Sequence, residues 1–178
     1  TKIGRVVFKM TDAAAEMGSV SSIEVTVDNI KVHSAAKGWI DVSSSGKTYD
    51  LLQLKASNEY ALLADMELEE GKYEQIRLDI SKVVVTDVEG QHEAKLPSGE
   101  LKIIGDLVVE SNSTSTVNFD FIADQSLHET GNGKYIMAPV IKVEIREDAD
   151  AEVENNKVKI KSGNLKTNIE IGMDIDGN

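Results

Sequence analysis

The chain carries acidic side chains whose spacing suits the binding of a hard metal ion. Asp148, Asp150 and Glu152 alternate, so a strand would place them on one face, and Asp174 and Asp176 have the same spacing. Carboxylate oxygens at such intervals are the ligands that Ca²⁺ prefers. The segment from Asp174 lacks the distal bidentate glutamate of a calcium loop, and solvated acidic faces have the same composition. Ca²⁺ binding and a plain acidic surface are therefore alternatives.

Two aromatic residues are candidates for contact with carbohydrate. Trp39 is the one tryptophan of the chain, and with Tyr49 it could form a platform on which a sugar stacks. The alternative is that both rings belong to the core or its rim. Asn112, in the sequence Asn-Ser-Thr, is a glycosylation acceptor in a polar turn, where a glycan would be tolerated.

The residue types needed for catalysis do not occur in suitable patterns. The three histidines, His33, His92 and His128, are isolated from one another, so a histidine metal site is not expected. No glycine-rich phosphate loop precedes a helix, and no serine lies in a strained turn between a strand and a helix. We therefore expect that the protein is not an enzyme.

Charge and composition exclude several classes of protein. Lys and Arg number 19 against 31 Asp and Glu, a net charge of −12, which argues against nucleic acid as a partner. The absence of cysteine excludes disulfide scaffolds, thiol catalysis and thiolate zinc sites. No apolar run approaches the roughly 18 residues of a membrane-spanning helix, so no transmembrane segment is expected.

The elements that must position these side chains are predicted to be strands. The chain has 18 Val and 16 Ile against 12 Leu, and β-branched residues pack well on a pleated surface. Apolar residues alternate in several runs, and the parity slips near Asp28 and Asn29, which predicts a β-bulge there. Turn residues separate the runs. The pattern predicts an all-β fold, an antiparallel β-sandwich with one short α-helix.

The helix is expected just after Ser57 or Asn58, either of which could cap it. Leu62, Leu63 and Met66 would then share one helical face, and Gly71 would follow the end.

The composition changes near residue 146 and divides the chain in two. We expect a sandwich domain over residues 1–146, then an acidic linker and C-terminal strands over residues 147–178. Six acids and one base lie between Glu144 and Glu154, and a turn is expected at residues 162–164 before apolar alternation resumes. These strands either fold back onto their own sheet or pair with a neighbouring subunit.

Blocks distributed over residues 4 to about 146 resemble the bacterial and archaeal family called domain of unknown function 4382. The blocks are Thr11–Ala13, Ile23–Val27, Gly38–Trp39, Tyr49–Leu54, Gly71–Leu78, Leu96–Gly99, Leu101–Ile103, Gly131–Ile136 and Pro139–Ile141. The chain departs from the family at Ala14, where proline is usual. The resemblance implies an extracytoplasmic β-sandwich and supplies no catalytic residues. Lipid anchoring would need an N-terminal cysteine, which is absent here.

These observations lead to two expectations for function. The first is a non-enzymatic, secreted or cell-surface structural protein that assembles with itself into a filament or tube by β-strand complementation, helped by Ca²⁺. The alternative is a monomeric carbohydrate-binding or adhesin-type surface module. Thr1 is not a methionine, so either an expressed segment starts there or a signal peptide has been removed before it.

Overall fold

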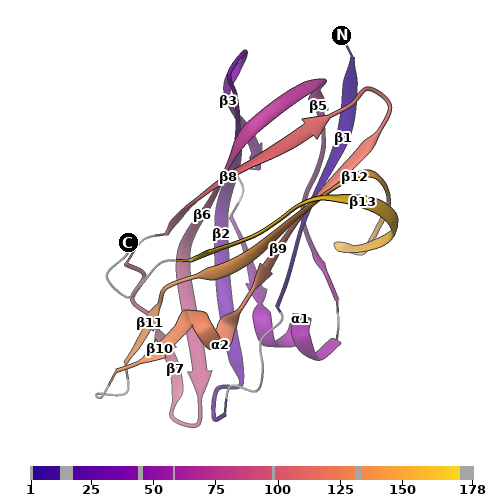
Figure 1. The fold of residues 1–178 in the computed structure, drawn as a ribbon. Coiled ribbons are helices and arrows are strands. Elements are labelled where there is room, and N and C mark those ends of the chain that lie inside the picture. The colour runs from indigo at the N-terminus through magenta and orange to yellow at the C-terminus, as the bar shows by residue number, and fades with distance from the viewer. Residues whose placement is uncertain are drawn as a thin grey trace.

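The chain folds into two β-sheets that pack face to face (Figure 1). The computed structural model describes residues 2–12, 18–43, 46–57, 59–97, 99–130 and 134–172. The first sheet contains, in spatial order, β1 (Ile3–Asp12), β5 (Ala61–Glu69), β13 (Lys157–Gly172), β12 (Val140–Glu154) and β9 (Thr114–Phe121). It closes on itself because β13 also pairs with β5, with Lys157 opposite Ala61. The prediction of an all-β fold is confirmed.

The second sheet has six strands among the described residues. They are β3 (Gly38–Ser43), β2 (Ser22–Ser34), β6 (Gly71–Asp87) and β7 (Gly90–Glu93), with β4 (Lys47–Asp50) paired to β2 and β8 (Glu100–Val109) paired to β6. A small separate sheet joins β10 (Leu127–Glu129) to β11 (Tyr135–Met137). The short helices are α1 (Leu51–Ser57) and α2 (Ala123–Ser126), where the sequence predicts a single helix.

The core lies between the two sheets and follows from the alternation of apolar residues. Phe8, Phe119 and Val143 project from the first sheet, and Val25 and Ile76 from the second, all without solvent exposure. Burial of each such side chain stabilises the folded state by about 1.5–3 kcal/mol relative to leaving it exposed. The predicted bulge is confirmed, because the register between β2 and β6 shifts beside Val27. One pair departs from the antiparallel expectation, since β1 and β9 run parallel.

The predicted helix lies in the wrong place. Residues Ala61–Glu69 form β5, which pairs antiparallel with β1, and the helix α1 precedes them. Asp50, not Ser57 or Asn58, precedes the helix, and its carboxylate accepts a hydrogen bond of 3.1 Å from the Leu52 amide. Good helix formers such as Leu and Met therefore lie in a strand, because pairing with a neighbouring strand outweighs intrinsic propensity.

The expected acidic linker is also a strand. β12 runs without interruption from Val140 to Glu154, and β13 returns beside it to Gly172, so these C-terminal residues fold back onto their own sheet. The hairpin turn is at Asn155 and Asn156, both with positive φ, whereas residues 162–164 continue β13. Asparagine tolerates positive φ in two-residue hairpin turns, which explains this location.

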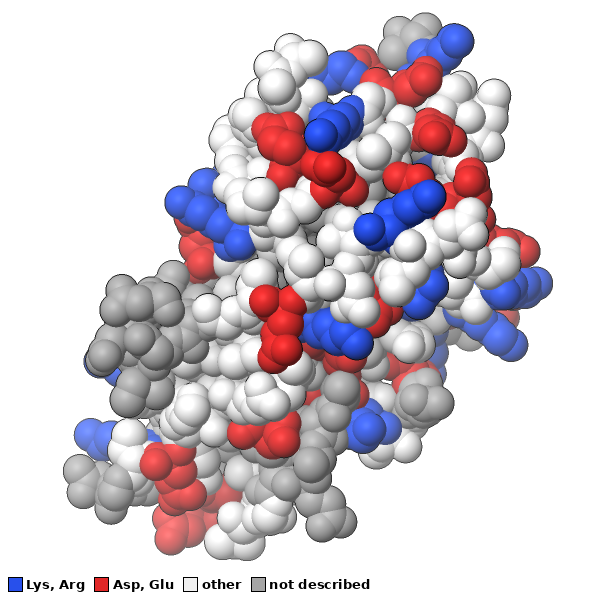
Figure 2. Space-filling model, viewed as in Figure 1, with Lys and Arg blue, Asp and Glu red and all other residues white. Residues whose placement is uncertain are grey.

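Charged residues of both signs intermingle on the face shown in Figure 2, despite the strong net negative charge. No helix in the described part of the chain is long and apolar enough to span a membrane.

A close backbone approach at the start of β1 gives a first prediction. A Cβ placed on Gly4 would lie 2.3 Å from the Glu110 carbonyl oxygen, whereas one on Gly105 would lie 3.5 Å from its nearest neighbour, Thr167. We expect Gly4→Ala to lower the free energy of unfolding by roughly 1–3 kcal/mol, a typical cost of overpacking. Gly105→Ala serves as the control and should change it little. Urea denaturation of both variants measures the difference, and equal midpoints would contradict the assignment.

Candidate functional site

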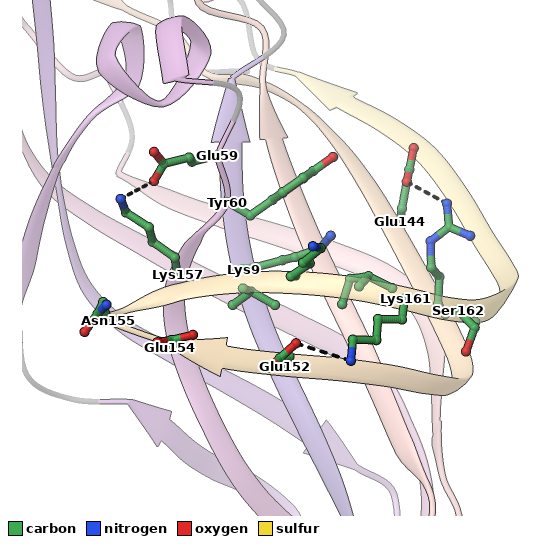
Figure 3. A pocket seen from close by; sticks show the side chains of 15 residues that line it. Lys9, Glu59, Tyr60, Glu144, Glu152, Glu154, Asn155, Lys157, Lys161 and Ser162 are labelled. Atoms are coloured by element: carbon green, nitrogen blue, oxygen red, sulfur yellow. Dashed lines mark hydrogen bonds and ion pairs between the residues drawn. The ribbon is translucent and has the colours of Figure 1, made fainter.

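A cavity of about 850 Å³ lies between the outer face of the first sheet and the β12–β13 hairpin (Figure 3). The hairpin extends beyond the last residue of β12 that pairs with β9, Arg146, and reaches the start of β5. It therefore arches over the face of the sheet that is turned away from the core. The volume is within the range of small-molecule binding sites.

Lys9 of β1 lines this cavity and is the most unusual residue in it. It is 5% exposed, and among the described residues its ammonium has no hydrogen-bond or ion-pair partner. The Tyr60 ring lies beside it, with the Lys9 Nζ 3.7 Å from the ring centroid. A buried charge without a counter-ion destabilises the folded state, so such groups are rare outside functional sites.

Burial lowers the pKa of the Lys9 ammonium to about 8, and the positive charge of Arg146 acts in the same direction. Glu144 offsets part of this shift. The effect of burial is the larger one, because water that would solvate the ammonium is excluded.

Strand register places further polar groups on the same face of the sheet. Lys9 pairs with Asn118 of β9, which pairs with Glu144 of β12, and the next row contains Thr116 and Arg146. The Asn118 Oδ1 and Thr116 Oγ1 atoms are buried without a hydrogen-bond partner in the described part of the chain. Buried polar atoms usually have partners, so this face is polar beyond what the fold itself requires.

Ion pairs lie along the rim of the cavity. Lys157 and Glu59 are 2.5 Å apart, and Lys161 and Glu152 are 3.4 Å apart (Figure 3). Arg146 is 3.5 Å from Glu144. These glutamates pair with other cations, and no carboxylate among the described residues lies within ion-pair distance of the buried Lys9.

Hydrogen bonds hold the hairpin over the cavity. The Leu62 amide donates to the Asn156 carbonyl at 2.8 Å, and the Val158 amide donates to the Tyr60 carbonyl at 2.9 Å. On the other flank Arg5 donates to the Ala151 carbonyl at 3.1 Å. Backbone and side-chain bonds from two strands thus fix the roof of the cavity.

The sequence analysis missed this site. Lys9 lies between Phe8 and Met10, and in an amphipathic strand it looks like an ordinary solvent-facing residue. One signal was available, because the next residue on the same face, Val7, is apolar and is buried in the structure. Apolar residues on both faces of β1 indicate that both faces are covered.

Trp39, the first predicted ligand-binding residue, lies on the outer face of the second sheet and does not line the cavity. Trp39 is 41% exposed and pairs in register with His33. The ring centroids of Trp39 and His33 are 4.9 Å apart, and the Arg77 guanidinium lies 4.6 Å from the Trp39 centroid. The exposed indole is thus already in contact with two side chains.

Tyr49, the second predicted ligand-binding residue, does not lie beside Trp39. It pairs in register with the buried Val25, so it is on the core side of the sheet, and its hydroxyl donates to the Leu62 carbonyl at 3.0 Å. Residues on opposite faces of one sheet cannot form a shared platform. The predicted aromatic pair is therefore not formed.

The predicted metal ligands of β12 are not gathered at one point. Asp148 accepts a hydrogen bond of 3.0 Å from the Ser113 hydroxyl, and Glu152 pairs with Lys161. The register between β12 and β13 shifts between residues 147 and 150 and again beside Asp150, which breaks the alternation expected from the sequence.

No group of three or more His, Asp or Glu side chains that could hold a metal ion occurs within the described ranges. Asp174 and Asp176 lie outside those ranges.

Asn112, the predicted glycosylation acceptor, is exposed in the turn between β8 and β9 with φ of 60°.

Comparison with known proteins identifies a family that matches most of the chain. The family model described as domain of unknown function (DUF4382) matches residues 3–139. No curated protein and no solved structure matches the chain. The matched residues include Lys9, Tyr60 and Asn118, whereas the hairpin that covers them lies outside the match.

The lowered pKa of Lys9 predicts a dependence of stability on pH. The unfolded chain keeps the lysine proton up to a pH near 10.5, whereas the folded protein releases it near 8. Between these values the unfolded state binds more protons, so the free energy of unfolding rises with pH, by roughly 2–3 kcal/mol.

Urea denaturation of the wild type and of Lys9→Met from pH 7 to 10.5 isolates this effect, because the tyrosines and the other lysines are common to both proteins. We expect Lys9→Met to be the more stable protein at pH 7 and the difference to shrink as the pH rises. A difference that stays constant over this range would contradict the burial of a charged Lys9.

Proposed function

The chain belongs to the DUF4382 family, and we propose that it is a non-enzymatic, secreted or cell-surface domain that binds a small organic anion beneath its C-terminal hairpin. The observation that carries the proposal is the buried Lys9 ammonium, which faces a cavity and lacks a counter-ion among the described residues. A ligand carboxylate would supply the missing charge and accept hydrogen bonds from Lys9. We propose a secreted or cell-surface compartment because the family resemblance implies an extracytoplasmic domain.

The lining suggests which anion fits best. Beside Lys9 and Arg146, the cavity is lined by hydrogen-bond acceptors such as Glu154, Asn155 and Ser162. A ligand that carries only a carboxylate would leave these acceptors unused, whereas ligand hydroxyl groups would donate to them. A hydroxylated carboxylate, such as a sugar acid, matches both kinds of group. This proposal keeps carbohydrate as the ligand class and moves the site away from Trp39.

Assembly by strand exchange is less well supported. The alternating residues of the tail, from which the sequence predicts exchange, pair inside the chain up to Gly172. Their pattern is thus explained without a second subunit. Binding in the cavity also explains the unneutralised Lys9, which strand exchange does not.

Matched ligands and matched variants test the proposal. We expect galacturonate to raise the thermal unfolding midpoint of the wild type, because a ligand at a hundred times its Kd stabilises by about 2.7 kcal/mol. Galactose, which has the same ring without the carboxylate, should have little effect. Lys9→Met should lose the response to galacturonate.

Lys102→Met, at an exposed lysine of β8 on the other sheet, is the control and should keep the response. A midpoint shift of equal size in Lys9→Met and the wild type would overturn the proposal. So would equal shifts with galactose and galacturonate.

A further inference from the structure

Lys9 differs chemically from the other lysines that the structure describes, because it alone among them is buried. Lysines such as Lys102 and Lys157 are more than half exposed. A lysine reacts as a nucleophile only in its neutral form, and desolvation together with a neighbouring positive charge favours that form. Lys9 meets both conditions, since it is 5% exposed and Arg146 lines the same cavity.

The neutral form of Lys9 is well populated near neutral pH. With a pKa of about 8, roughly a quarter of Lys9 would be neutral at pH 7.5, against about 0.1% for an unperturbed lysine. The Nζ atom has no hydrogen-bond partner among the described residues, so no donor occupies the lone pair of the neutral amine.

We propose that Lys9 captures aldehyde-bearing organic anions covalently, as an imine formed within the cavity. This proposal deepens the binding function above and rests on it, because the anion must first enter the cavity. The nitrogen lone pair attacks the aldehyde carbon, and the carbonyl oxygen takes a proton to give a carbinolamine. The carbon–oxygen bond then breaks, the oxygen leaves as water with both protons of the amine, and a carbon–nitrogen double bond remains. No electron acceptor or donor is needed.

The groups around Lys9 have distinct places in this reaction. Arg146 lies one register row from Lys9 on the same face and would pair with the carboxylate of the bound aldehyde. The Tyr60 ring lies 3.7 Å from the Nζ atom and closes one side, so the aldehyde would approach from the cavity. Ligands that carry both an aldehyde and a carboxylate should therefore react faster than simple aldehydes.

Reductive trapping tests the proposal. Glyoxylate, which carries both groups, is added to the full chain at pH 7.5 with cyanoborohydride, and peptide mass spectrometry locates the carboxymethylated lysines. We expect Lys9 to be labelled at least tenfold faster than Lys102, and acetaldehyde to label it more slowly than glyoxylate does. Lys9→Met should remove the fast phase, whereas Lys102→Met should retain it. Circular dichroism verifies that both variants are folded.

The outcomes separate this proposal from the binding function. Labelling spread evenly over the exposed lysines would overturn imine formation. If galacturonate still stabilised the wild type and failed to stabilise Lys9→Met, the binding function would stand without the covalent step. If galacturonate has no effect while glyoxylate labels Lys9 rapidly, imine formation is supported, and the preference for sugar acids is the part that fails.

Discussion

Alternation of side chains along the strands of the first sheet governs the rest of the structure. Because successive residues point to opposite faces, the strand that sends Phe8 and Met10 into the core must send Val7 and Lys9 to the other side. The second sheet covers the core face. The outer face would leave Val7 in water if nothing lay over it. The β12–β13 hairpin covers this face, and the cavity is the space that remains between the two.

Covering that face has an energetic cost at Lys9. A buried ammonium without a counter-ion destabilises the fold, and the apolar contacts of Val7 and of Val158 on the hairpin offset part of this cost. Nothing in the packing requires a lysine at this position, since an apolar side chain of similar length would occupy the same space. Residues that lower stability in this way are concentrated at functional sites.

The sequence predicted the fold class well, because strand periodicity depends on local pattern alone. It failed where pairing between distant segments decides the outcome. Residues Ala61–Glu69 are good helix formers, yet β1 pairs with them and holds them in a strand. The turn at Asn155 and Asn156 could have been recognised from asparagine's tolerance of positive φ. For the burial of Lys9 the sequence offered only the apolar Val7 on the same face, since this burial depends on a hairpin whose closest point in sequence lies more than 130 residues away.

The two walls of the cavity have different origins within the chain. The part of the floor that β1 and β9 form belongs to the residues that match the family, whereas β12 and β13, which complete the floor and form the roof, follow the last matched residue. The inner half of β12 is fixed by its pairing with β9, whereas the outer half is free of that pairing. Changes of length or sequence near the hairpin turn would thus reshape the roof without disturbing the core. The shape of the cavity can in this way vary while the scaffold stays intact.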